Sequence, residues 1–232
     1  MRFRETARRS RYGHAGPRAA ILIALAGSLA LCASGTSATG AKTKAPLSRR
    51  DLCCLPYSEA HSLGRESIPI LKSMLSDPSE KERWSRIVGT IAYVGVPESF
   101  VVLRDFMWNR FSGVVDDDTF RALLAVPNVL GVIPGTTVMD FLEAAANPAF
   151  WDSLPWKERV YSQRQLSVLL SEVSINGLAC NNSPRAAAIL EQLERKPYSP
   201  RQIANIKEGI AINREIREKG LARYLENQWR HY

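Results

Sequence analysis

The sequence contains few of the residues from which catalytic and metal sites are usually built. Of its 232 residues, only three are histidines and four are cysteines. Four cysteines are too few for a small fold held together by disulfides, and no two histidines have the spacing of a zinc-binding motif. The chain also has no Gly-x-Ser-x-Gly motif, no phosphate-binding glycine-rich loop and no dinucleotide-binding fingerprint. These absences favour a non-enzymatic protein without a cofactor.

The chain carries a net charge of +8, but this charge is unevenly distributed. Residues 1–50 hold ten basic residues and one acidic residue, whereas residues 51–232 hold 21 basic and 22 acidic residues. A protein that binds nucleic acid usually concentrates Lys and Arg in its folded part, because neutralising phosphates supplies much of the affinity. We therefore expect no nucleic-acid partner. The 45% apolar content predicts a body that folds.

The segment 1–41 has the order of a secretory signal. A basic stretch is followed by an uncharged apolar run, Ala19–Ala33, and then by small residues. We expect cleavage between Thr36 and Lys42, and hence an exported protein that is periplasmic or secreted. Alternatively, residues 19–41 remain as a membrane anchor, because an uncharged stretch of 23 residues can just span a bilayer.

After a linker at residues 42–57, the apolar residues of residues 58–232 recur at spacings of three and four. This is the period of helices that bury one face, and no alternating strand pattern is present. We expect an all-α body of about eight helices. The apolar stripes lie at residues 68–75, 84–94, 100–111, 120–124, 138–145, 166–178, 186–193 and 203–210, followed by 221–229.

Short signals predict where several of these helices begin and end. Ser183-Pro184 is typical of a helix start, and Ser79 followed by Glu82 has the capping-box pattern. Gly95 predicts a helix end. We expect Pro127 to kink or end its helix, because proline lacks the backbone N–H that the helix needs.

The predicted helices form pairs that repeat at intervals of about 40 residues, in the range of HEAT and armadillo repeats. The segment Ile68–Val102 resembles a HEAT repeat, with Asp77 in the turn, Arg83 at the start of the second helix and Gly95 at its end. The resemblance implies that Asp77 fixes the turn and that Arg83 reaches back toward it.

Gly131 and Gly177 stand in segments that resemble further repeat ends, whereas Pro127 and residues 147–155 interrupt the pattern. The HEAT resemblance is specific only over residues 66–110. It implies a short α-solenoid of about four antiparallel helix pairs, in which neighbouring pairs bury each other's apolar faces. The surfaces of such arrays usually bind a protein or a peptide.

Three sets of residues are candidates for specific sites. Trp151 and Trp156 flank a Leu-Pro dipeptide in a predicted loop, and we expect them to form an exposed aromatic binding site. The run Asp116–Asp118, with His61, could hold a metal ion. The same run is explained more simply as charge compensation at a helix N-terminus.

In an oxidising compartment, Cys180 could form a disulfide with Cys53 or Cys54. Such a bond would tie the end of the linker to the third helix pair, and it would stabilise the fold by closing a long loop. The alternative is that these thiols remain unpaired.

The leading interpretation is an exported, non-enzymatic interaction or scaffold protein that binds a protein or peptide on its helical surface. One alternative is a cell-envelope hydrolase with a metal site near Asp116–Asp118. The other is a membrane-anchored structural protein. In each case we expect membrane contact only through the N-terminal segment.

Overall fold

The computed structural model describes residues 55–230, and almost all regular structure within them is helical, so the body is all-α as predicted. The predicted segment 1–41 and residues 42–54 of the predicted linker lie outside the described residues. The α-helices are α3 (Tyr57–His61), α4 (Ile68–Ser76), α5 (Trp84–Val94), α6 (Pro97–Trp108), α7 (Asp117–Val129), α8 (Thr136–Ala145), α9 (Gln163–Ala179), α10 (Pro184–Glu194), α11 (Pro200–Lys219) and α12 (Leu221–Arg230). Shorter elements are the 3₁₀ turns η1 (Arg65–Ser67), η2 (Pro78–Arg83), η3 (Leu130–Val132) and η4 (Pro148–Trp151), and the strands β1 (Gly113–Val114) and β2 (Trp156–Lys157).

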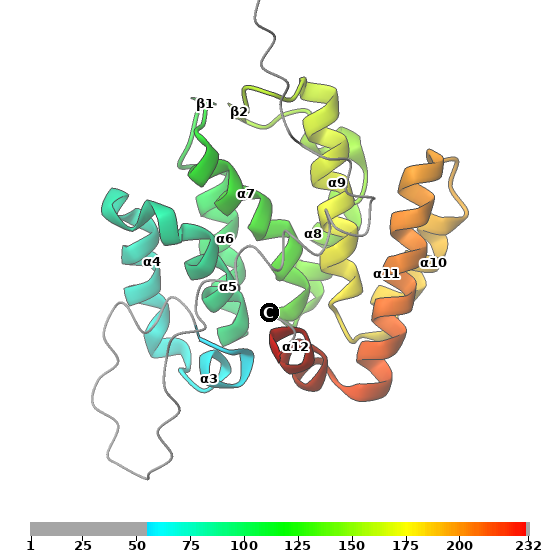
Figure 1. The fold of residues 1–232 in the computed structure, drawn as a ribbon, viewed down its shortest axis with the longest axis horizontal. Coiled ribbons are helices and arrows are strands. Elements are labelled where there is room, and N and C mark those ends of the chain that lie inside the picture. Colours follow the sequence, from blue (N-terminus) through cyan, green and yellow to red (C-terminus); the bar gives the residue numbers. More distant parts are fainter. Residues whose placement is uncertain (1–54, 231–232) are drawn as a thin grey trace, which may run out of the picture.

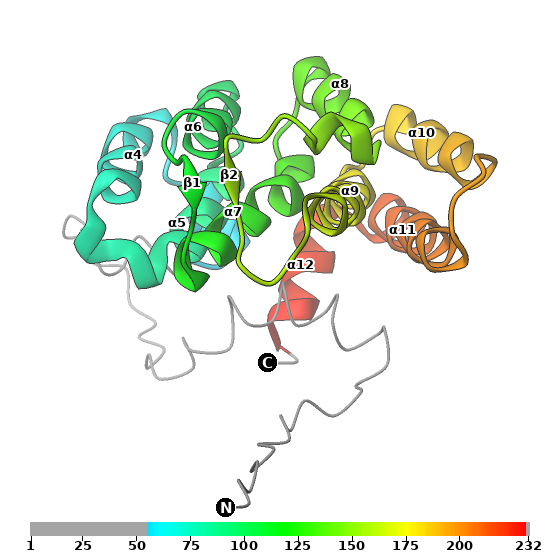
Figure 2. The ribbon, with the colours of Figure 1, turned by 90° about the horizontal axis from the view of Figure 1, so that it is seen from above.

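Eight of the helices form two layers (Figure 2). Helices α4, α6, α8 and α10 make one layer, and α5, α7, α9 and α11 make the other. In the second layer each helix packs against the next, α5 on α7, α7 on α9 and α9 on α11. Each is also in contact with the helix that precedes it in the sequence, so the layers consist of four sequential pairs.

Helix α5 illustrates how sequence patterning produces this packing. It is covered by α3, α4, α6 and α7, and eight of its eleven residues are buried, including Trp84, Ile87 and Ile91. Gly95 ends the helix with a φ of 71°, as predicted, because glycine adopts this left-handed conformation without steric cost. The predicted start at Ser183-Pro184 is also confirmed, since the Ser183 side chain accepts a hydrogen bond from the backbone of α10.

The first and last described helices meet (Figure 1). Helix α3 packs on α5, and α12 extends from α11 back to α3. Leu55 is buried and the ring of Tyr57 packs edge-on against Tyr93 at 5.5 Å. These two residues, which the sequence analysis placed in the linker, are therefore part of the folded body.

At Gly131 and Gly177 the backbones of α7 and η3 come very close to the backbone of α9. A Cβ atom on Gly131 would lie 1.7 Å from the carbonyl oxygen of Gly177, and one on Gly177 would lie 2.2 Å from that of Pro127. Gly177 lies in the last turn of α9, which ends at Ala179. Its role is to let the backbones of α7 and α9 touch, which a periodicity argument cannot reveal.

Some local predictions need correction. Helix α7 continues through Pro127 to Val129 before η3 begins, so the helix does not end at the proline. Asp77 is the N-terminal cap of η2, since its carboxylate accepts a hydrogen bond from the Ser79 N–H. Ser79 is therefore not the cap. Arg83 pairs with Glu80 at 3.2 Å, although the HEAT resemblance implied Asp77 as its partner.

Two short parallel strands form where no strand was expected. Gly113 of β1 pairs with Trp156 of β2, and Val114 pairs with Lys157. The Gly113 N–H donates to the carbonyl of Pro155 at 3.0 Å. The pairing joins the segment before α7 to the segment before α9, and it fixes the loops at this end of the molecule.

Candidate functional site

The two tryptophans predicted to be an exposed binding site are fully buried. The indole N–H of Trp151 donates to the carbonyl of Ala145 at 2.7 Å, and that of Trp156 donates to the carbonyl of Met107 at 2.9 Å. The Trp151 ring also stacks on Trp108 at 5.4 Å. The prediction of an exposed aromatic site is therefore wrong, because each indole satisfies its polar atom on the main chain and can then enter the core.

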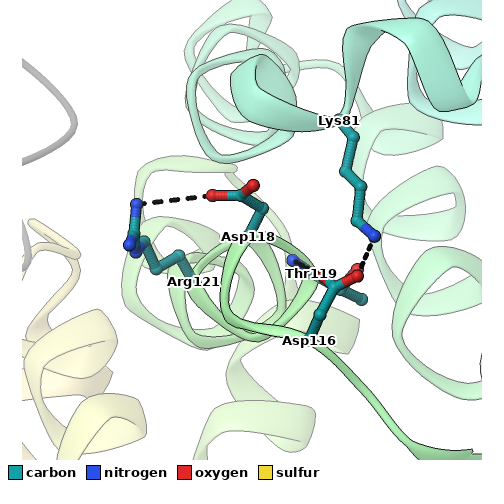
Figure 3. Close-up of polar contacts among 5 residues, drawn as sticks. All are labelled: Lys81, Asp116, Asp118, Thr119 and Arg121. Atoms are coloured by element: carbon teal, nitrogen blue, oxygen red, sulfur yellow. Dashed lines mark hydrogen bonds and ion pairs between the residues drawn. The ribbon is translucent and has the colours of Figure 1, made fainter.

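The acidic run Asp116–Asp118 starts helix α7, and two of its three carboxylates pair with cations (Figure 3). The Asp116 carboxylate accepts the Thr119 N–H at 3.1 Å and forms an ion pair with Lys81, and Asp118 pairs with Arg121 at 3.4 Å. The hydrogen bond from Lys81 lowers the pKa of Asp116 from 3.8 to about 2. These contacts are those of a helix N-terminus with compensated charge.

His61 is not brought to this acidic run. It lies at the end of α3, where its Nδ1 is 3.2 Å from the carbonyl oxygen of Tyr93 and its ring stacks on Tyr57 at 5.4 Å. Helix α3 and the start of α7 lie at opposite ends of the molecule in Figure 1. In residues 55–230 no three His, Cys, Asp or Glu side chains are grouped as a metal site would require.

Cys180 is buried and forms no disulfide within residues 55–230, and burial raises the pKa of its thiol to about 12. Its neighbour is Tyr93, whose own pKa is raised mainly by burial and further by the thiol. Because Tyr57 packs against Tyr93, Cys180 lies near the start of α3. The predicted partners Cys53 and Cys54 lie outside the described residues, so the disulfide stays a prediction.

Among the described residues, an open groove of about 610 Å³ lies beside the first half of α9. We call it the α9 groove. Its walls come from η4, from α9 and from the turn into α11, so it lies where the third helix pair meets the fourth. The residues that line it are Pro148, Ala149, Asp152, Gln163, Arg164, Ser167, Val168, Tyr198 and Gln202.

Internal hydrogen bonds fix one wall of the α9 groove. Ser167 donates to the Asp152 carboxylate at 2.8 Å, and Gln163 donates to the carbonyl of Trp151 at 3.2 Å. Arg164 is exposed, and within the described part of the chain no ion pair of its guanidinium is found. Tyr198 is partly buried, which raises the pKa of its hydroxyl.

The chemistry of the α9 groove is mixed, with apolar surface, amide and hydroxyl groups, one cation, Arg164, and one carboxylate, Asp152. Such a lining can hold an extended peptide by main-chain hydrogen bonds and can pair one acidic group with Arg164. The groove could not be predicted from the sequence, because its walls come from three separate segments, within 148–152, 163–168 and 198–202. The one available signal was the stretch 147–155, which interrupted the helical pattern.

A second hollow of about 400 Å³ lies between α4 and α6. Arg110, which lines it, places its guanidinium 4.5 Å above the ring of Trp84 and donates to the carbonyl of Leu75. Burial lowers the pKa of Arg110. The only arginine that lines this hollow is therefore already engaged in internal contacts. The hollow is the weaker candidate for a binding site.

None of the helices within residues 55–230 is both long enough and apolar enough to cross a bilayer. No protein-family model matches the chain, and no curated protein or solved structure matches it either.

Proposed function

We propose that this protein is a non-enzymatic interaction protein, built from HEAT-like helix pairs, that binds an extended segment of another protein in the α9 groove. The observation that carries the proposal is the groove itself, a hollow of about 610 Å³ between two adjacent helix pairs. Stacked helix pairs create extended surfaces of this kind, and their usual ligands are peptides or proteins. This last step is an analogy between folds.

The charge of the groove specifies the ligand further. Arg164 is the cation of the groove, and Asp152 accepts a hydrogen bond from Ser167. A peptide with an acidic side chain or a free carboxylate near an apolar residue would pair with Arg164 and cover Val168 and Tyr198. We also propose export, on the basis of segment 1–41, with cleavage favoured over retention as an anchor.

The proposal is tested by selecting peptides from a random phage-displayed library on the immobilised full-length chain. We expect acidic peptides whose binding is lost in Arg164→Glu and strongly reduced in Tyr198→Ala. The matched control is Lys72→Glu, which makes the same charge reversal on an exposed residue of the other hollow. Thermal unfolding of each variant verifies that it is folded.

Two outcomes would contradict the groove proposal. The first is a selection that enriches no peptide. The second is a set of enriched peptides that bind Arg164→Glu as well as they bind the unaltered chain. N-terminal sequencing of the protein isolated from its source cells tests export separately, because cleavage predicts a start between Thr36 and Lys42, whereas an anchor predicts that residues 19–41 are retained.

A further inference from the structure

Exposed apolar side chains gather at one end of the molecule. Five large apolar residues are markedly exposed among residues 55–230, and three of them, Val114, Val160 and Tyr161, lie in or next to the β1–β2 pair. Val160 is 80% exposed and Val114 is 60% exposed. We call these three residues the apolar tip. It lies at the end opposite α3 and α12 (Figure 1), whereas Ile70 and Val101 stand singly on α4 and α6.

The apolar tip is held outward by a fixed loop. The buried carboxylate of Glu158 accepts hydrogen bonds from the N–H groups of Val160 at 2.6 Å and Tyr161 at 3.1 Å. The ring of Tyr161 lies on Phe120 at 5.8 Å. Because a buried acceptor and an aromatic contact define its shape, the loop presents Val160 to solvent in the folded state.

Basic residues surround the apolar tip. Lys157 and Arg159 are exposed on either side of Glu158, whose charge is turned inward. Three acidic residues, Asp116–Asp118, lie at the start of α7. Asp116 forms an ion pair with Lys81, and Asp118 forms one with Arg121. Asp117 is the remaining exposed acid, so among these residues the exposed side chains outside ion pairs are two cations, Lys157 and Arg159, and one acid.

We propose that the apolar tip inserts into the surface of a lipid bilayer that carries anionic headgroups. A stable protein interface needs about 800 Å² from each partner, which is more than three side chains provide. Membrane insertion, in contrast, needs only a few projecting apolar groups with flanking cations. A tyrosine at the rim of the tip suits the boundary between headgroups and acyl chains.

This inference is independent of the α9 groove, and it departs from the expectation that only the N-terminal segment touches a membrane. It gives the folded body a preferred orientation, with the β1–β2 end toward the bilayer and α3 and α12 away from it. A weak contact of this kind would act together with an anchor or with a membrane-bound partner, since two weak membrane signals reinforce each other.

The test must report on the tip itself, because the N-terminal segment of the full chain can bind vesicles on its own. A photoreactive amino acid is placed at Val160 in the full-length chain, and at Val101 as the matched control on α6. Each protein is irradiated with vesicles of phosphatidylcholine, with and without phosphatidylglycerol. Lipid adducts are quantified by mass spectrometry.

We expect about tenfold more lipid adduct from position 160 than from position 101, and only with vesicles that contain phosphatidylglycerol. In the double variant Lys157→Glu, Arg159→Glu, the adduct at position 160 should fall about tenfold. Equal labelling at the two positions would overturn the proposal. Cross-links from position 160 to a second copy of the chain, in place of lipid, would overturn it as well.

Discussion

Replacing Gly177 with alanine tests whether the backbone contact between α7 and α9 organises the fold. The new Cβ would lie 2.2 Å from the carbonyl oxygen of Pro127, which is far inside normal contact distance. The clashing atom belongs to the backbone, so no side-chain rotation can relieve the clash. One helix must move relative to the other, and the adjoining contacts of Gly131 and Asn181 move with it, since the Asn181 amide donates to the Gly131 carbonyl at 2.8 Å.

The expected loss follows from two opposing effects. Overpacking a buried contact costs about 3 kcal/mol at the upper end of its typical range, which applies here because backbone meets backbone. Alanine in place of glycine inside a helix returns about 1 kcal/mol. The net loss of about 2 kcal/mol should lower the melting temperature by about 4–8 °C for a chain of this size.

Gly89 provides the matched control, because it lies inside α5 and a Cβ there would meet no atom within 4 Å. Gly89→Ala should therefore raise the melting temperature by about 2–4 °C through helix propensity alone. Thermal unfolding followed by far-ultraviolet circular dichroism measures both variants. A melting temperature for Gly177→Ala at or above that of the unaltered chain would refute the reasoning.

Three further predictions concern single side chains. Asp116→Asn should destabilise the protein above pH 4, because it removes the ion pair with Lys81. The difference in unfolding free energy between variant and unaltered chain should vanish as the pH falls from about 4 to about 2, because the pKa of Asp116 is 3.8 unfolded and about 2 folded. Urea unfolding across that range measures this difference, and a difference that does not change with pH would contradict the prediction. Cys180, as a buried thiol with its pKa raised to about 12, should react with a thiol reagent only after denaturation; no reaction in unreduced denatured protein would instead indicate a disulfide. Trp156→Phe should lower the free energy of unfolding by about 2 kcal/mol, since it leaves the buried Met107 carbonyl without its donor; an unchanged midpoint in urea would argue against this role.

The helices and many of their boundaries were predictable from the sequence, because the signals that specify them are local. The period of apolar residues marks each stripe, and Gly95 and Ser183 act on the backbone within one turn of themselves. Asp116 belongs to the same class, because a helix cap needs only the next three residues. Where local signals competed, as at Asp77 and Ser79, the sequence offered two caps and the fold used one.

The sites could not be predicted in this way, because they depend on distant segments. Trp151 looked like a loop residue, but Trp108 of α6 and Phe141 of α8 pack against its ring and it is fully buried. The α9 groove likewise needs Asp152 and Tyr198 to come together across the stack. Sequence separation carries no information about such proximity unless a repeat pattern is regular enough to predict it.

The sequence by itself determined the class of the fold, the positions of most helices and the concentration of positive charge before residue 51. Each of these is a property of neighbouring residues or of composition. The tertiary structure alone decided that Gly177 is a helix contact and that Val114, Val160 and Tyr161 are exposed at the β1–β2 end. The physical reason is that the burial of a residue and its close contacts depend on which distant parts of the chain pack against it.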